Sequence, residues 1–301
     1  RRIDVYIKLR DLTIAIENKI WADDQENQLS DYADYLKLKS NEKYLLLYLN
    51  PYGTQPSEKS IKSSYKTELL NKNKLKKRLK KVKRNIKKSC KKVGRNPSEI
   101  TIVAVSKNHF SKKIKFFQKN NIDIFGENRV QELRRKNNKL NSEVKWHFIG
   151  HLQRNKVKYI TRMDNCLMIE SLDSDRLAKE INKRAKKNNR VMPVLVEVNT
   201  SGDENKYGFQ VEETIDFLEK AEKKYDNLDI RGLMTIVPYL DNPEDTRPYF
   251  KKLANLKNKA NKKGLNLTEL SMGMTNDYQV AIEEGATIVR IGTALFGERK
   301  Y

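Results

Sequence analysis

The chain has 301 residues, of which 38% are hydrophobic, and its 62 basic and 39 acidic side chains give a formal net charge of +23. No apolar run reaches the roughly 18 residues that span a bilayer, and no charged segment followed by an apolar one opens the chain, so transmembrane and secreted classes are not expected. The length suffices for one large hydrophobic core, or for one core and a small additional module.

Residues 1–55 are predicted to form a small α/β module. The expected order is two strands, a helix and a third strand, over Ile3 to Leu9, Leu12 to Ile20, Asp24 to Leu36, and Tyr44 to Leu49. About fifty residues are too few for a well-stabilised independent domain, so we expect an incomplete module. The following segment is rich in Ser, Pro and Lys, which predicts a linker over residues 56–71.

Three charged side chains of this module form a candidate nuclease site. Glu17 and Lys19 are two residues apart on one predicted strand and share a face, and Asp4 on the preceding strand can lie beside them in a hairpin. Two carboxylates that bind Mg²⁺ beside a lysine that orients water suit phosphodiester hydrolysis. Ordinary charges on an exposed face are the alternative.

With Gln28, Leu29 and Tyr32, these segments resemble the PD-(D/E)XK nuclease superfamily. The resemblance implies a truncated nuclease-like fragment without activity, because the family's leading helix, with a further acidic residue, would precede Arg1. The first 60 residues hold 9 basic and 10 acidic side chains, so the module has no electrostatic attraction for a phosphate backbone.

The second predicted domain, residues 72–301, begins with a basic helix over residues 72–92. Apolar residues recur there at helical spacing, namely Leu75, Leu79, Val82, Ile86 and Cys90. Residues 61–95 hold 16 basic residues and 1 acidic residue, so most of the net charge lies on this segment. We interpret it as the solvated face of an amphipathic helix; a polyanion-binding helix is the alternative. The lack of aromatic residues argues against stacking on single-stranded nucleic acid.

Strand and helix patterns then alternate to the end of the chain. Eight strands are predicted over Thr101 to Val105, Asp123 to Gly126, Trp146 to Gly150, Cys166 to Glu170, Pro193 to Val198, Arg231 to Ile236, Glu269 to Met272, and Thr287 to Ile291. Helices are predicted over Val130 to Leu140, Asp175 to Lys187, Val211 to Lys223, Pro243 to Lys262, and Asp277 to Glu284. Continuous apolar strands with crossover helices predict a (β/α)8 barrel of the TIM type; an open doubly wound sheet is the alternative.

In such barrels the chemistry lies at the carboxyl ends of the strands. That rule selects Lys107, Glu127, Asn128, His151, Asn199, Met234, Thr235, and the loops that contain Ser271 and follow Arg290. A lysine drawn into a partly dry barrel mouth loses hydration of its ammonium form, which favours the neutral amine and its attack on an aldehyde. Pyridoxal phosphate is the commonest cofactor that forms such an imine.

The loops after the last two strands are a candidate phosphate cradle. They are Ser271-Met272-Gly273-Met274-Thr275 and Gly292-Thr293-Ala294, and each combines a glycine with hydroxyl donors. Two ordinary glycine turns are the alternative. Arg290 precedes the second loop, and its permanent charge beside a pyridine nitrogen would keep that nitrogen unprotonated and weaken the ring as an electron sink.

From Leu75 to Arg299 the chain resembles the pyridoxal phosphate homeostasis protein family, whose barrel is similar to the first domain of alanine racemase. The matching segments are Ala104-Val105-Ser106-Lys107, Gly126-Glu127-Asn128, Gln131-Glu132, Trp146-His147-Phe148-Ile149-Gly150-His151-Leu152-Gln153, Gly232-Leu233-Met234, Ser271-Met272-Gly273-Met274, and Arg290-Ile291-Gly292-Thr293-Ala294-Leu295-Phe296-Gly297. They occur in the family's order and cover the whole second domain.

The resemblance implies a role for each site residue. Lys107 is the imine lysine, Arg290 faces the pyridine nitrogen, Asn128 and Met234 lie beside the ring, and the phosphate contacts come from Ser271, Gly273, Gly292 and Thr293. Two residues depart from the family pattern: Arg129 replaces an aromatic residue, and Thr275 replaces a serine. No proposed ligand is lost.

His147 and His151 are four residues apart, a spacing that suits zinc on a helix. Here they bracket a strand end, and no glutamate follows the first histidine. We therefore expect ring-lining or hydrogen-bonded core roles and no metal.

The sequence predicts a protein that holds pyridoxal phosphate as an imine on Lys107 and buffers or delivers it, without strong catalysis. A racemase or decarboxylase on the same fold is the alternative, but the related racemases use an acid/base residue from a second, β-rich domain that we do not expect after Thr293. Nuclease action is the third hypothesis. We expect a cytoplasmic monomer with reduced Cys90 and Cys166, serving pyridoxal phosphate-dependent apoenzymes, with neither membrane nor nucleic acid as partner.

Overall fold

The computed structural model describes residues 5–8, 13–18, 44–49, 63–140, 143–203 and 205–298, with side chains from Asn73 onward. The chain divides into two compact units, Arg1–Lys76 and Lys77–Tyr301.

The first unit contains a three-stranded sheet. Strand β1 (Val5–Lys8) pairs with β2 (Thr13–Asn18) antiparallel, and β2 pairs with β3 (Tyr44–Leu49) parallel. The predicted hairpin and third strand are confirmed. Glu17 lies on β2, whereas Asp4, Lys19 and the helix predicted over 24–36 lie outside the described residues.

Helix α2 (Ser63–Lys92) begins nine residues before the predicted start, so the predicted linker is helical from Ser63 on. Its apolar residues are buried as expected: Leu75, Leu79, Val82, Ile86 and Cys90. In the second unit, Asn85 donates to the hydroxyl of Tyr278 at 3.0 Å, and Lys92 pairs with Glu283 at 2.6 Å. Both partners lie on α9 (Tyr278–Glu283), so α2 packs against that helix.

Eight parallel strands of the second unit close into a barrel. They are β4 (Thr101–Val105), β5 (Ile124–Glu127), β6 (Lys145–Phe148), β7 (Cys166–Leu172), β8 (Met192–Asn199), β10 (Leu228–Met234), β11 (Glu269–Ser271) and β12 (Ile288–Ile291). Neighbours in sequence pair in that order, β8 pairs with β10, and β12 pairs with β4. The closure confirms the (β/α)8 barrel and excludes the open sheet. The short strand β9 (Phe209–Gln210) is added beside β8.

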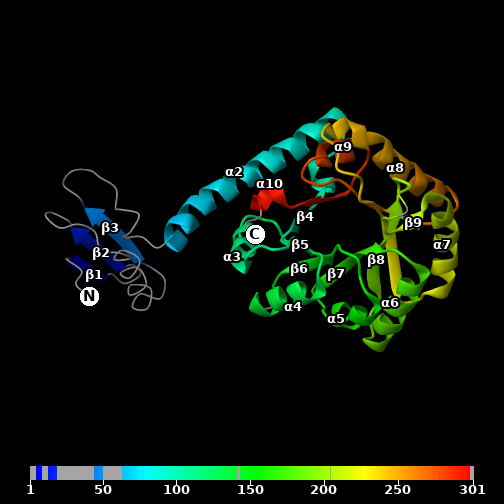
Figure 1. Ribbon diagram of the computed structural model, residues 1–301, viewed down its shortest axis with the longest axis horizontal. Coiled ribbons are helices and arrows are strands. Elements are labelled where there is room, and N and C mark those ends of the chain that lie inside the picture. The colour runs from blue at the N-terminus through cyan, green and yellow to red at the C-terminus, as the bar shows by residue number, and fades with distance from the viewer. Residues whose placement is uncertain are drawn as a thin grey trace. The chain divides into compact units, whose positions relative to one another are not determined.

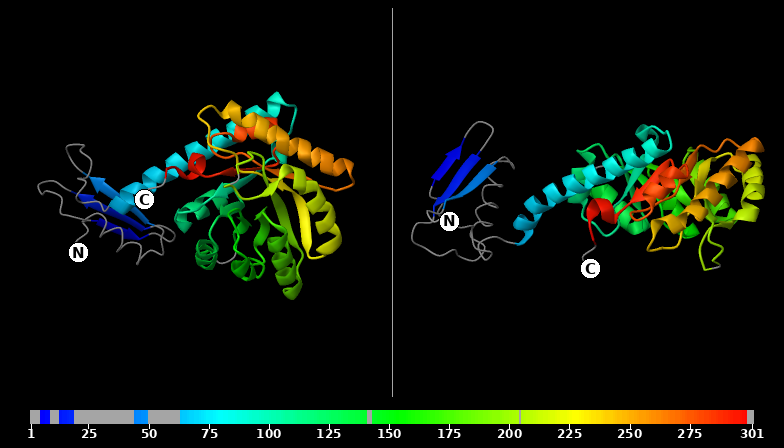
Figure 2. Two further views of the ribbon diagram at one scale, coloured as in Figure 1. Left: turned by 45° about the vertical axis from the view of Figure 1, so that its right-hand side comes forward. Right: turned by 90° about the horizontal axis from the view of Figure 1, so that it is seen from above.

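Helices lie outside the ring of strands in every view (Figures 1 and 2). They are α3 (Ser111–Gln118), α4 (Val130–Lys139), α5 (Val157–Ile160), α6 (Asp175–Lys187), α7 (Val211–Lys224), α8 (Arg247–Lys262), α9, and α10 (Thr293–Phe296), with short 3₁₀ turns at 97–99, 154–156 and 243–246. The sequence did not predict α3, α5 or α10. The other predicted helices of the second unit match within a few residues. Helix α8 begins at Arg247, because the predicted first turn, Pro243–Thr246, is a 3₁₀ segment.

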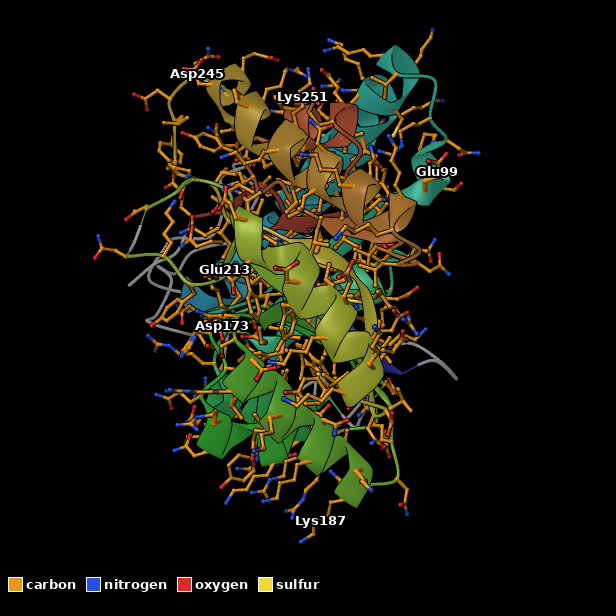
Figure 3. All side chains as sticks on the ribbon, turned by 90° about the vertical axis from the view of Figure 1, so that its right-hand side faces the viewer. Glu99, Asp173, Lys187, Glu213, Asp245 and Lys251 are labelled. Atoms are coloured by element: carbon orange, nitrogen blue, oxygen red, sulfur yellow. The ribbon has the colours of Figure 1, made fainter. Side chains whose placement is uncertain are left out.

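An apolar cluster fills part of the interior of the barrel. The central cluster comprises Val103, Val105, Ile149, Met168, Leu195, Met234 and Ile288. Figure 3 shows the barrel from the side: Asp173, Glu213 and Asp245, near the starts of helices, lie toward one edge, and Glu99, which precedes β4, lies toward the other. Since each helix begins where a strand has ended, the first edge is the carboxyl end of the barrel.

Candidate active site at the carboxyl end of the barrel

The predicted site residues lie on strands that are neighbours in the barrel. Arg290 on β12 is in register with Val103 on β4, and Lys107 follows β4 by two residues. Ser271 ends β11, the other neighbour of β12. The pairing of these two strands therefore brings the lysine from one end of the domain and the arginine from the other to the same region of the barrel.

Arg290 is the centre of a buried hydrogen-bond network. Its Nη1 donates to the hydroxyl of Ser271 at 2.6 Å, and its Nη2 donates to the carbonyl of Thr235 at 2.8 Å. Ser271 in turn donates to Glu170 Oε2 at 2.6 Å. The guanidinium is 4% exposed and lies 3.8 Å from the Glu170 carboxylate, so its orientation is fixed by residues on β7 and β11 and by Thr235, which follows β10.

The network continues to His147. Its Nδ1 lies 2.6 Å from Glu170 Oε1, and both side chains are buried. Burial raises the pKa of Glu170, but the hydrogen bond and charge of His147, the charge of Arg290 and the hydroxyl of Ser271 outweigh it, and the pKa lies below its ordinary value. Burial lowers the pKa of Arg290, and the charge of Glu170 opposes that effect. A carboxylate thus faces the guanidinium. His147 has the hydrogen-bonded core role that was expected.

The hydroxyl of Ser271 is engaged inside the barrel, since it accepts from Arg290 and donates to Glu170. Its predicted phosphate contact stays a prediction. The structure adds a second role, because Ser271 joins the arginine to its carboxylate.

The two predicted phosphate loops are joined to each other. The amide of Ala294, at the start of α10, donates to the hydroxyl of Thr275 at 3.2 Å. Thr275, one of the two residues that depart from the family pattern, therefore connects the loop after β11 with the loop after β12. Gly273 has φ +90°, and a Cβ there would lie 2.6 Å from Ala281 Cβ and 2.8 Å from Tyr278 Cα. No other residue fits this turn, which presses against α9. Thr293 is exposed and Gly292 half-buried at the mouth.

Asn128 and Met234 occupy different depths. Asn128 directly follows β5 and is half-buried, and Gly150 lets it approach closely, because a Cβ on Gly150 would lie 2.5 Å from the Asn128 carbonyl oxygen. Met234 is fully buried in the barrel cluster. The loops after β5 and β6 lie together because these strands are paired, and Gly150 permits their close approach.

A second group of polar residues lies at the same edge, and sequence reasoning missed most of it. His151 Nδ1 lies 2.7 Å from Asp173 Oδ2, and the ring stacks on Tyr207 with a centroid separation of 4.0 Å. Glu197 on β8 is 6% exposed, and burial followed by the charge of Asp173 raises its pKa to about 7. The available signal was an acidic residue inside an apolar strand, as at Glu170 and Glu197.

Among the described residues no group of three or more His, Cys, Asp or Glu side chains is placed to hold a metal ion. Within the same residues no helix is long and apolar enough to cross a membrane. Cys90 and Cys166 are free and buried.

The residues at this edge fit pyridoxal phosphate by their chemistry. They offer a lysine, a buried guanidinium held by a carboxylate, and a glycine turn that a Cβ would fill. Lys107 is half-buried and Arg290 is buried, so the two side chains lie at different depths of the barrel mouth.

Comparisons with known proteins support this description. Residues 78–300 match the family model for the alanine racemase N-terminal domain, and residues 1–113 match that of the PD-(D/E)XK nuclease superfamily. The pyridoxal phosphate homeostasis protein of Aquifex aeolicus is 48% identical over 226 residues, which cover 74% of this chain and 98% of that protein. The human protein of the same name is 40% identical over 226 residues, covering 69% and 82%.

Solved structures agree. PipY of Synechococcus elongatus with pyridoxal phosphate bound is 30% identical, with a TM-score of 0.62, and the match covers 71% of this chain and all of that one. Alanine racemase of Clostridium difficile, 19% identical with a TM-score of 0.57 over 75% of this chain and 56% of that one, shares the fold. The site geometry, the family model and the relatives lead to one assignment: from residue 78 on, the chain belongs to the pyridoxal phosphate homeostasis protein family, on the barrel of the alanine racemase N-terminal domain.

Proposed function

We propose that the barrel binds pyridoxal phosphate and takes part in its homeostasis. The observation that carries the proposal is the pairing of β12 with β4, which brings buried Arg290 and Lys107 to one edge beside the loops around Gly273 and Gly292. The PipY structure with pyridoxal phosphate bound supports it. Lys107 would hold the aldehyde end of the cofactor, Arg290 the pyridine nitrogen, and Ser271, Gly273, Gly292 and Thr293 the phosphate, with Asn128 and Met234 beside the ring.

The cofactor would supply an aldehyde carbon that a neutral lysine amine attacks. The chain's own residues limit the chemistry that this site can perform. Because Arg290 stays protonated, it cannot serve as the acid that would charge the pyridine nitrogen, and the ring remains a poor electron sink. The site therefore suits holding and exchange of the cofactor better than strong catalysis.

The proposal also covers the partners of the protein and its location in the cell. We propose that the protein is a monomer that delivers pyridoxal phosphate to dependent apoenzymes in the cytoplasm. Two buried free thiols support a reducing compartment. Reactivation of an added apoenzyme by the loaded protein, faster than by free cofactor at equal concentration, is the expected result.

The central test is an absorbance spectrum with and without pyridoxal phosphate. We expect a visible imine band that Lys107→Ala abolishes and that Lys158→Ala, at another half-buried lysine, leaves unchanged. Borohydride reduction followed by mass spectrometry should place the label on Lys107. A wild-type protein without a band would overturn the proposal, and turnover of D- or L-alanine would favour the racemase alternative.

A further inference from the structure

The peptide groups on both sides of Lys107 are held by a buried cluster of charged side chains. The carbonyl of Ser106, in the peptide before Lys107, accepts from Lys136 Nζ at 2.6 Å. The amide of Asn108, in the peptide after it, donates to Glu132 Oε1 at 2.7 Å. We name Lys136, Glu132 and Glu127 the Lys136 cluster. Its contacts fix the backbone on either side of the proposed imine lysine.

The ammonium group of Lys136 is fully hydrogen-bonded within the cluster, whereas Glu127 Oε2 is buried without a hydrogen-bond partner among the described residues. Lys136 Nζ also contacts Glu127 Oε1 at 2.6 Å and Glu132 Oε1 at 2.7 Å, so all three donors of the ammonium group are used. Ser106 adds a hydrogen bond from its hydroxyl to Glu127 Oε1 at 2.6 Å. Burial raises the pKa of Glu132, but the hydrogen bonds from Lys136 and Asn108 outweigh it, so the pKa lies below its ordinary value and the side chain is ionised.

The cluster holds a turn that is not relaxed. Asn108 has φ +62°, in the left-handed region that asparagine tolerates at a cost. Glu132 and Lys136 lie one turn apart on α4, and they are 8% and 3% exposed. A rigid helix therefore carries the groups that keep the turn in this conformation.

Burying three charged groups is expensive, and apolar residues of similar size would stabilise the fold as well or better. Two of these buried charges, Lys136 and Glu132, bind the two peptide groups that flank Lys107. We propose that Glu132 and Lys136 are positioning residues for Lys107, which fix its backbone so that its amine is held for imine formation. The inference rests on the proposed function and adds two residues to it.

The chemical step is balanced without a further reactant. The neutral amine of Lys107 would add to the aldehyde carbon, a C=N bond would replace the C=O bond, and the aldehyde oxygen would leave as water with the two amine protons; nothing is oxidised or reduced. Fixing the backbone removes rotations that would otherwise carry the amine away, so it should accelerate this step without changing how the rest of the cofactor is held.

The test uses three variants of the full chain. Glu132→Leu removes the contacts to Asn108 and Lys136. Glu132→Gln keeps both, because they go to the same oxygen, which an amide also offers. Glu180→Leu is the matched control, since Glu180 and Arg184 form an i,i+4 pair on α6 that is partly exposed.

Two measurements are made on each variant. In the cofactor-free protein, hydrogen exchange of the segment 106–110 should be about tenfold faster in Glu132→Leu than in the wild type. After mixing with pyridoxal phosphate, the imine band should form about tenfold more slowly. Glu132→Gln should stay within roughly threefold of the wild type in both, and Glu180→Leu should change neither.

A third measurement distinguishes a positioning role of Glu132 from a general folding defect of the variant. In the Lys107→Ala background, which retains only non-covalent contacts, Glu132→Leu should leave the affinity for pyridoxal phosphate unchanged. An equal fall in affinity and in imine formation would overturn the inference, as would wild-type kinetics in Glu132→Leu or an equal loss in Glu132→Gln. A wild type without any band would instead overturn the proposed function, and the inference with it.

Discussion

At the scale of single residues, the buried charges of the barrel are the sites most sensitive to substitution. Glu170→Gln removes the carboxylate whose charge acts most strongly on buried Arg290, while the charges of Glu197 and Asp277 remain, and breaking such a buried pair typically costs about 3 kcal/mol or more. We expect that loss in the free energy of unfolding, measured by urea denaturation. Glu180→Gln is the control, since its ion pair with Arg184 is partly exposed and should contribute less than about 1 kcal/mol. Equal losses would show that Glu170 does not balance Arg290.

Glu197 should make stability depend on pH. Its pKa is raised from 4.5 to about 7, mainly by burial and then by the charge of Asp173. The folded state therefore holds a proton that the unfolded state has lost between these values. Its stabilising contribution is complete below pH 4.5 and is lost as pH rises through about 7, with a total of up to about 3 kcal/mol.

Urea denaturation at about pH 5 and about pH 8 checks this expectation. The Glu197→Gln variant, which cannot ionise, should gain stability relative to the wild type at the higher pH. If the difference between the two proteins is the same at both pH values, Glu197 does not carry the pH dependence.

The sequence predicted which residues lie near the carboxyl ends of the barrel strands but not how they are bonded. Lys107 and Arg290 were selected because strand ends and apolar runs are visible in the sequence. Lys136 was not selected, because nothing in the sequence distinguishes it among the 62 basic residues. Only the fold shows that α4 places its ammonium group against the Ser106 carbonyl. Likewise, no pattern shows that the Ser271 hydroxyl donates to Glu170.

At the scale of elements, the turn after β11 depends on one glycine. Gly273 and Gly264 have nearly equal φ values, +90° and +93°, but a Cβ on Gly264 meets nothing within 4 Å. Gly264→Ala should therefore cost only the backbone strain of about 1 kcal/mol. Gly273→Ala should cost about 2 kcal/mol more, because the new methyl group displaces α9.

The two glycine variants are compared by urea denaturation and by retention of pyridoxal phosphate. Only Gly273→Ala should weaken retention, since it moves the loop that faces the proposed phosphate. If both variants lose the same stability and retention, the close approach to Ala281 is not the reason for the glycine.

Elements with strong local signals were predicted almost to the residue. Helix α6 was predicted with its observed bounds, because the Ser174 side chain accepts from the Leu177 amide as an N-cap and apolar residues recur regularly along the helix. Helix α3 was missed, because Phe110 precedes it without a side-chain cap and only Ile114 and Phe117 are buried. Its existence is decided by packing on the barrel, which local sequence does not report.

At the scale of the whole molecule, two family models share one chain. The nuclease match extends to residue 113, whereas the structure assigns residues from Lys77 on to the barrel unit. Composition separates the parts as well, because the first 60 residues are nearly neutral while the exposed face of α2 is strongly basic. The interpretation of residues 1–55 as a fragment and the absence of nuclease activity remain proposals.

Barrel closure by β4 and β12 also has a consequence for biosynthesis. Val103 on β4 cannot pair with Arg290 on β12 until nearly the whole domain has been translated, which takes roughly 10 to 40 s at ordinary rates. During that interval one edge of β4 lacks its partner strand, and an unpaired edge is a template for aggregation. Lys107 follows the first strand of the barrel and Arg290 lies on the last, so no nascent chain can assemble the site before the barrel closes.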